Sequence, residues 1–104
     1  MRRGVFACLA LAACAVPPGH EAFMRVMDRQ VGKQADEADF YPVLYRLRVV
    51  DAKTLANGDT EEEYRAGPKG DCRLFFEETP SERRVVRWRF EGGERECVLV
   101  VPQR

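Results

Sequence analysis

The sequence is poor in the side chains on which catalysis usually depends. It contains a single histidine, His20, and a single serine, Ser81. A hydrolytic triad needs a nucleophile and a base within hydrogen-bond reach, and a third group that orients the base. His20 follows a proline-rich stretch and Ser81 falls in a predicted hairpin turn, so nothing suggests that they meet. We therefore expect no enzymatic activity and no small-molecule substrate.

The chain also lacks an excess of charge of either sign. Seventeen basic side chains balance seventeen acidic ones, which gives no electrostatic basis for binding nucleic acid. The acidic run over 59–63 has the wrong order for a calcium loop, which needs alternating oxygen ligands and a glycine at the turn. We expect no metal ion and no cofactor.

No apolar run near the N-terminus is long enough to span a bilayer, which takes about 20 residues. The uncharged stretch over 4–13 follows the cationic start Met1-Arg2-Arg3 and is closed by Pro17-Pro18-Gly19. A short positive segment followed by a short apolar one is typical of a secretory signal peptide.

The end of this stretch, Leu11-Ala12-Ala13-Cys14, resembles the bacterial lipobox. The thiol of Cys14 would then receive a diacylglyceryl group. Further acylation would anchor the chain stably, because each buried CH₂ contributes about 0.8 kcal/mol. Ala13-Cys14-Ala15 also fits ordinary signal cleavage, so release after Ala15 is the alternative. In enteric bacteria an aspartate after the lipidated cysteine retains the protein in the inner membrane. Ala15 therefore favours the periplasmic side of the outer membrane, in its inner leaflet.

The predicted organisation has three parts. Residues 1–13 form a lipoprotein signal peptide, residues 14–19 a lipidated tether, and residues 20–104 one α+β domain. A domain of this size has a modest core.

The cysteines show neither a C-x-x-C pair nor a zinc-binding cluster. If Cys8 leaves with the signal and Cys14 carries lipid, Cys72 and Cys97 remain, and an even pair in an exported protein predicts a disulfide. In a flat meander the two would lie about 9–10 Å apart, beyond the usual Cα separation of roughly 4.4–6.8 Å. Either the bond is absent, or the tail curls over the hairpin after Gly92-Gly93. The two glycines favour the curl.

Helical periodicity comes first along the domain. Phe23, Met27 and Val31 recur at helical spacing and predict a helix over 20–30, with Gly32 as its stop. A second short helix is predicted over 34–40, ended by Tyr41-Pro42 because a residue before proline avoids the α region.

From Val43 onward the period changes to two, which predicts strands. They are expected over 43–50, 60–66, 72–78, 84–91 and 97–101. A loop over 51–59 turns at Asn57-Gly58, and the strand over 60–66 is predicted to lie at an edge. The fold class is therefore α+β, with one or two short N-terminal helices packed on a three- to four-stranded antiparallel sheet.

The strands over 72–78 and 84–91 form the strongest predicted hairpin. Their inward faces are apolar: Cys72, Leu74 and Phe76 on one strand, and Val86, Trp88 and Phe90 on the other. Their outward faces carry a candidate partner surface, which consists of Arg73, Phe75, Arg87 and Arg89. These arginines would contact lipid phosphate, peptidoglycan or an acidic partner, or else pair with Glu77 and Glu91 across the strands. Phe75 is either an exposed binding aromatic or a covered one.

Several short motifs together resemble a known family. They are Val31-Gly32-Lys33, Pro42, Asn57-Gly58, Glu63-Tyr64-Arg65, Cys72-Arg73-Leu74-Phe75-Phe76 and Trp88-Arg89-Phe90-Glu91-Gly92. With the lipobox, this order is similar to that of the SmpA/OmlA (BamE-like) outer-membrane lipoproteins. The resemblance implies an accessory role in barrel assembly. The family usually carries Gly-x-Pro after its second helix, where this chain has Phe40-Tyr41-Pro42.

The function we expect is a binding or scaffold component of the cell envelope, held at the membrane through Cys14 and contacting an envelope protein. The alternative is a periplasmic inhibitor of a lysozyme or protease. Such an inhibitor would present an exposed loop, for which Leu55 to Asp59 and Gly67 to Asp71 are the candidates.

Overall fold

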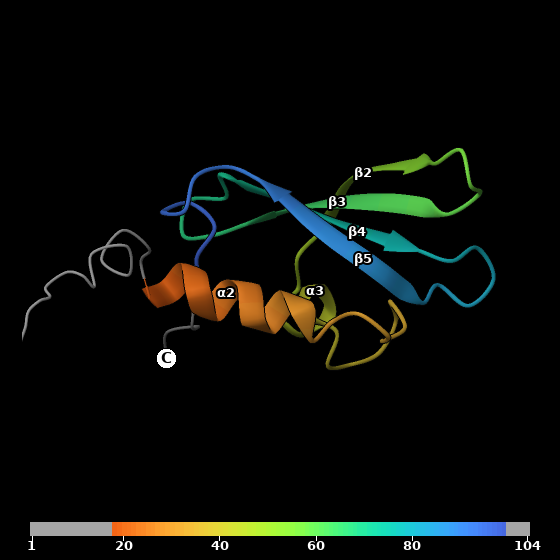
Figure 1. Cartoon of the computed structure of the whole chain (residues 1–104), viewed down its shortest axis with the longest axis horizontal. Helices are drawn as coiled ribbons and strands as arrows, with labels where there is room; N and C mark the ends of the chain where they lie inside the picture. Colours follow the sequence, from red (N-terminus) through yellow and green to blue (C-terminus); the bar gives the residue numbers. More distant parts are fainter. Residues whose placement is uncertain (1–17, 100–104) are drawn as a thin grey trace, which may run out of the picture.

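The computed structural model describes residues 18–99, in which two helices lie against one face of a four-stranded antiparallel sheet (Figure 1). The strands follow one another as a meander: β2 (Val49–Thr54), β3 (Thr60–Ala66), β4 (Cys72–Glu78) and β5 (Val85–Glu91). The α+β class and the four-stranded sheet agree with the prediction. The predicted signal peptide, the predicted lipobox and Cys14 lie outside the described residues. Within 18–99, no helix is long and apolar enough to cross a membrane.

The first helix, α2 (Pro18–Asp28), forms where helical spacing predicts one. Phe23 and Met27 are fully buried, whereas Val31 lies beyond the helix and is 45% exposed. The helix begins within the predicted tether of 14–19, because the fixed φ of proline suits a first helical turn.

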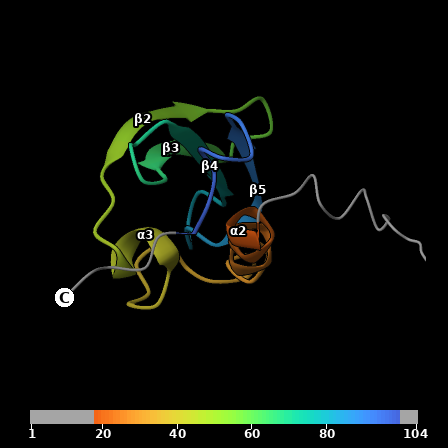
Figure 2. The same cartoon turned by 90° about the vertical axis from the view of Figure 1, so that its left-hand side faces the viewer.

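Aromatic rings fix α2 against β5, on the same face of the sheet as α3 (Figure 2). The ring of Phe23 lies 6.2 Å from that of Trp88 and 6.3 Å from that of Phe90, in edge-to-face contacts. The indole of Trp88 also donates a hydrogen bond to Asp28 at 2.9 Å. The helix therefore covers the apolar half of β5.

The helix predicted over 34–40 is absent. Backbone donors there bind the start of β5 instead: the N–H of Gly32 donates to the carbonyl of Val85 at 2.8 Å, and that of Ala35 to Arg83 at 2.9 Å. Because these peptide groups are engaged across the sheet, the segment runs as turns along β5.

Proline begins the second helix rather than ending one. The single-turn helix α3 (Tyr41–Leu44) carries Pro42 in its first turn, where a missing N–H costs nothing. The N–H of Leu44 donates to the carbonyl of Phe40 at 2.8 Å and closes the turn. The strand predicted over 43–50 is therefore wrong for most of its length.

The edge of the sheet also differs from the prediction. β2 occupies the first part of the predicted loop over 51–59, so the strand over 60–66 lies inside the sheet. The predicted turn is confirmed: Gly58 has a φ of 92° and donates its N–H to the carbonyl of Leu55 at 2.9 Å.

The β4–β5 hairpin has the predicted register. Apolar side chains face each other across the ladder: Leu74 with Phe90, and Phe76 with Trp88. Val86 is the exception, because an irregularity between Glu77 and Glu78 shifts the pairing by one residue. Val85, which is 1% exposed, therefore takes the core position predicted for Val86.

Side chains from both helices close the core under the sheet. The ring of Phe40 lies 4.9 Å from that of Phe76. The buried Gln30 joins the helices, since its amide donates to the carbonyl of Val26 at 2.8 Å and accepts the N–H of Tyr41 at 2.9 Å. One polar side chain thus supplies partners for two helix ends that cannot bond to each other.

The chain after β5 curls over the end of the sheet, as the cysteine spacing predicts. Cys72 and Cys97 form a disulfide with a Cα separation of 4.9 Å, and both are fully buried. His20 lies 2.7 Å from the Cys97 carbonyl and ties the tail to the start of α2. The last strand, predicted over 97–101, does not form at 97–99, and the rest lies outside the described residues.

Replacing Cys72 by Ala should lower the free energy of unfolding by about 3–4 kcal/mol, because the bridge joins two residues 25 positions apart and so restricts the unfolded chain. Urea unfolding in oxidising and reducing buffer measures this effect. Reductant should move the midpoint of the natural chain and leave that of the variant unchanged. Equal midpoints for the natural chain in both buffers would contradict the prediction.

Candidate functional site

The sheet face opposite the helices, called here the outer face, carries the predicted partner surface. Side chains alternate along a strand, so every second residue points there. The outer face comprises Asp51, Lys53, Glu61, Glu63, Arg65, Arg73, Phe75, Glu77, Arg87, Arg89 and Glu91. The structure thus brings all four predicted residues onto one surface, together with carboxylates from β3 that sequence reasoning did not include.

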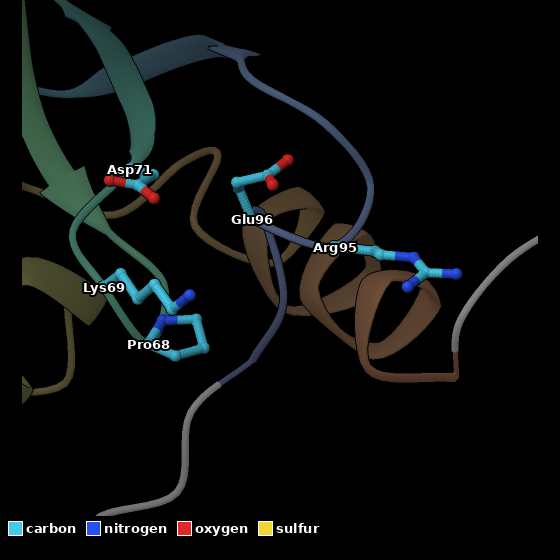
Figure 3. A pocket seen from close by; sticks show the side chains of 5 residues that line it. All are labelled: Pro68, Lys69, Asp71, Arg95 and Glu96. Carbon is cyan, nitrogen blue, oxygen red and sulfur yellow. The ribbon is translucent and has the colours of Figure 1, made fainter.

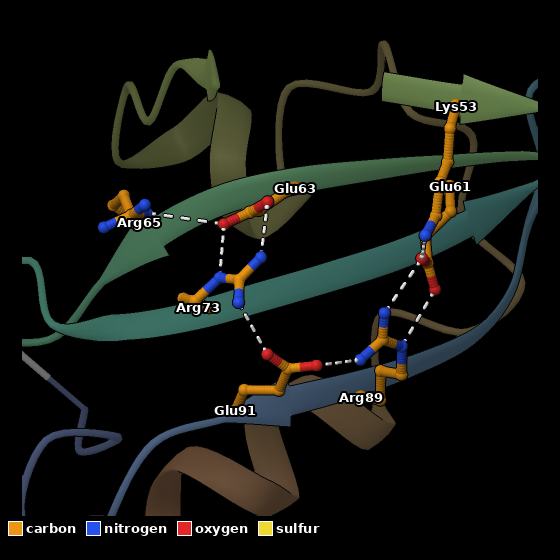
Figure 4. A network of polar contacts seen from close by, with 7 residues as sticks. All are labelled: Lys53, Glu61, Glu63, Arg65, Arg73, Arg89 and Glu91. Carbon is orange, nitrogen blue, oxygen red and sulfur yellow. Dashed lines mark hydrogen bonds and ion pairs between the residues drawn. The ribbon is translucent and has the colours of Figure 1, made fainter. Parts of the chain in front are cut away.

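Ion pairs join these strands in a continuous chain (Figure 4). Arg73 lies 2.7 Å from both Glu63 and Glu91. Arg89 lies 2.7 Å from Glu91 and donates two hydrogen bonds of 3.0 Å to Glu61. The hydrogen bond from Arg73 lowers the pKa of Glu63, and those to Glu61 and Glu91 raise the pKa of Arg89. The carboxylates and guanidinium groups therefore stabilise each other's charged forms.

Phe75 lies on the outer face, as the register predicts, but it is only 4% exposed. The guanidinium carbon of Arg89 lies 3.8 Å from the ring centroid, and that of Arg73 lies 5.2 Å from it. These cation–π contacts cover the ring, and the ion pairs on either side hold the two arginines over it. The interpretation of Phe75 as an exposed binding aromatic is therefore wrong.

The charges of the outer face balance, with five basic and five acidic side chains. Arg87 is the most solvent-exposed of the predicted arginines, with 70% of its side chain accessible, and it pairs with Glu77 at 2.9 Å. The cross-strand pairing with Glu77 and Glu91 is thus present. A balanced surface of this kind has no net attraction for anionic lipid.

No protein-family model, curated protein or solved structure matches this chain. Across the described part, no group of three or more His, Cys, Asp or Glu side chains is placed to hold a metal ion. The candidate sites are therefore defined by the geometry of this chain alone.

A cavity of about 230 Å³ lies where the tail crosses the turn after β3 (Figure 3). It is lined by charges of both signs and one proline: Pro68, Lys69, Asp71, Arg95 and Glu96. Gly67 permits this approach, because any side chain there would collide with the backbone carbonyl of Glu96. One of the two predicted inhibitory loops, Gly67 to Asp71, therefore borders a real hollow. The other, Leu55 to Asp59, turns at the opposite end of β3.

An acidic cluster on the inner side of the sheet escaped sequence reasoning. Glu78 is 1% exposed and lies 3.1 Å from Arg83, which also reaches Glu62 at 3.3 Å. The hydroxyl of Tyr64 donates to Glu62 at 2.8 Å. The sequence does contain an indication of a buried Glu78, because residues 72, 74, 76 and 78 share one side of a strand and the first three are apolar.

Glu78 and Glu62 are best described as a carboxylic acid beside a carboxylate. Burial and, after it, a side-chain hydrogen bond with Glu62 together raise the pKa of Glu78 to about 8, although the guanidinium group of Arg83 acts in the opposite direction. The Oε2 atom of Glu78 is buried and has no hydrogen-bond partner. A proton on Glu78 lets one carboxyl group donate to the other, which removes the repulsion.

Replacing Phe75 by Ala should lower the free energy of unfolding by about 3–5 kcal/mol, because buried Phe to Ala changes leave a cavity. The matched control is Arg87→Ala on the same face, whose exposed ion pair should contribute less than about 1 kcal/mol. Urea unfolding of both variants makes the comparison. Equal stabilities for Phe75→Ala and the natural chain would contradict the covered position of the ring.

Stability should fall as pH rises from about 5 to about 8, because folded Glu78 retains a proton that the unfolded chain loses near the ordinary glutamate pKa. Glu78→Gln, which mimics the protonated acid, should remove a loss of roughly 3–4 kcal/mol over this range. Melting temperatures of both proteins at pH 5, 6.5 and 8 measure the difference. Parallel pH profiles would show that Glu78 is ionised in the folded chain.

Proposed function

We propose that this chain is an envelope lipoprotein that acts as a binding or scaffold component, in an accessory role like that of the BamE-like proteins. The observation that carries the proposal is the Leu11-Ala12-Ala13-Cys14 motif directly after a short apolar segment. Acylation at Cys14 would hold the domain at the periplasmic side of the outer membrane.

Two features of the fold support an exported, anchored protein. The helix α2 begins at Pro18, so only residues 15–17 separate Cys14 from the folded domain. A chain this short would keep the domain beside the bilayer. The Cys72–Cys97 disulfide is a bond that persists in oxidising compartments such as the periplasm.

The outer face supports a protein partner rather than a lipid one. Its balanced charges offer no excess of cations to a phosphate surface. Exposed arginines held in fixed positions, such as Arg73 and Arg89, suit a partner that presents its own carboxylates and hydrogen-bond acceptors.

Inhibition of a periplasmic hydrolase is the second candidate, favoured by the loop from Gly67 to Asp71. The Cys72–Cys97 bridge adjoins this loop and holds it against the tail. An anchored, disulfide-held loop loses little entropy when it enters an enzyme cleft.

Cys14→Ser should leave the chain as an unprocessed precursor without acyl groups, because serine lacks the acceptor thiol. Intact-mass spectrometry of the protein from membrane and soluble fractions measures both properties. The control is Cys8→Ser, which alters the apolar segment and should leave processing unchanged. Normal cleavage and membrane attachment of the Cys14 variant would remove the lipoprotein proposal.

Crosslinking in native envelopes, followed by affinity capture of the tagged chain, tests the scaffold role. Recovery of barrel-assembly subunits in stoichiometric amounts supports the accessory role, and Arg87→Glu on the outer face should reduce that recovery. Recovery of a hydrolase whose activity falls on addition of the purified chain would favour inhibition instead.

A further inference from the structure

The two edge strands of the sheet, β5 and β2, differ in how far the rest of the domain contacts them. The edge of β5 is bonded at its start by Gly32 and Lys33 and is flanked by α2. All six residues of β2 are exposed, and within residues 18–99 no other strand pairs with its outer edge. In both views β2 lies at the margin of the sheet (Figures 1 and 2). An exposed edge of this kind is a template for an additional strand.

The backbone groups that face outward from β2 follow from the hairpin that joins it to β3. The N–H of Leu55 donates to the carbonyl of Asp59 at 2.7 Å, so Leu55 faces β3. Along an antiparallel strand such positions alternate. Lys53 and Asp51 therefore bond toward β3, and the N–H and C=O groups of Ala52 and Thr54 point to the open edge.

We propose that a second copy of this chain pairs with this edge, antiparallel and centred on Ala52. In that register Ala52 faces Ala52 of the other copy and bonds to it through both backbone groups. Asp51 of each copy then faces Lys53 of the other. These are non-hydrogen-bonded positions, where opposite side chains approach most closely. The pair closes with two-fold symmetry and forms an eight-stranded sheet.

Charge complementarity favours a second copy of this chain at the open edge of β2. Asp51 lies directly opposite Glu63 in the β2–β3 ladder, a like-charge pair, and makes no ion pair with another described residue. The ammonium group of Lys53 reaches Glu61 only at 4.0 Å, and 62% of its side chain is exposed. The second copy would place that lysine against Asp51 and relieve the repulsion.

The same pattern discriminates against other partners. A lysine on an edge strand usually deters pairing with foreign strands. Here Asp51 lies two residues before Lys53. Only a copy in this register places an aspartate opposite each lysine, which removes the unfavourable effect of the lysine on strand pairing. Val50, which is 50% exposed, would gain cover from Thr54 of the other copy.

Site-specific crosslinking of the full chain in intact cells tests the register, whether or not the chain is acylated. Ala52→Cys should give a covalent dimer with a short thiol crosslinker, because the two Cα atoms would lie about 5.5 Å apart. Thr54→Cys is the matched control, since its two copies would be separated by about 13 Å along the strands. The natural chain, which has no cysteine on β2, gives the background.

Charge exchange in the detergent-purified full chain tests the pairing itself by sedimentation equilibrium. Asp51→Lys should weaken dimerisation about 10-fold or more, because two attractive pairs become two repulsive ones. It should not harm the monomer, since a lysine there faces Glu63. Adding Lys53→Asp to that variant should restore the dimer to within about threefold.

The results that support the dimer are distinct from those that contradict it. Crosslinking at position 52 but not 54, with loss and rescue by the charge variants, supports the dimer. A monomer at every concentration, equal crosslinking at both positions, or a crosslink from position 52 to a different protein would overturn it. None of these results depends on acylation at Cys14, so the dimer and the lipoprotein proposal fail independently.

Discussion

The fold depends on β4, the strand that is buried on both of its faces. Residues 74–78 are all buried, although only alternate ones point toward the helices. Leu74 and Phe76 fill the core, while Phe75 is enclosed on the other side by guanidinium groups. A shift of one residue would send the apolar side chains of Leu74 and Phe76 to the wrong side, so the register of β3 and β5 follows from this strand.

Charged side chains are neutralised in different ways on the two faces of the sheet. On the outer face, acids and bases form ion pairs within and between strands. Glu63 contacts both Arg65 and Arg73, which offsets the repulsion between these two like-charge neighbours. On the inner face, Glu78 and Glu62 share the single cation Arg83. Three ionised groups there would leave one negative charge without a partner, so protonation of Glu78 completes the arrangement.

The outer face therefore offers less free positive charge for contacts than its number of arginines indicates. The guanidinium groups of the outer face are already paired, and the ring beneath them is covered. Besides the exposed parts of these arginines, the edge of β2 and the hollow beside Gly67 are open to solvent. The described domain therefore presents three distinct surfaces: a charge-balanced face, an open strand edge and a loop held by the disulfide.

Local features of the sequence determined the first helix, the Asn57-Gly58 turn, the disulfide and the β4–β5 register, since each depends on spacing within one or two segments. The spacing of Leu74 and Phe76 also placed Phe75 on the correct face. Whether that ring was exposed depended on Arg73 and Arg89, whose positions are held by carboxylates from neighbouring strands. Pro42 was equally ambiguous, because proline suits both the end of one helix and the first turn of the next. Only the tertiary structure decided between them, since the backbone of residues 32–35 bonds to β5 and leaves no helix for proline to end.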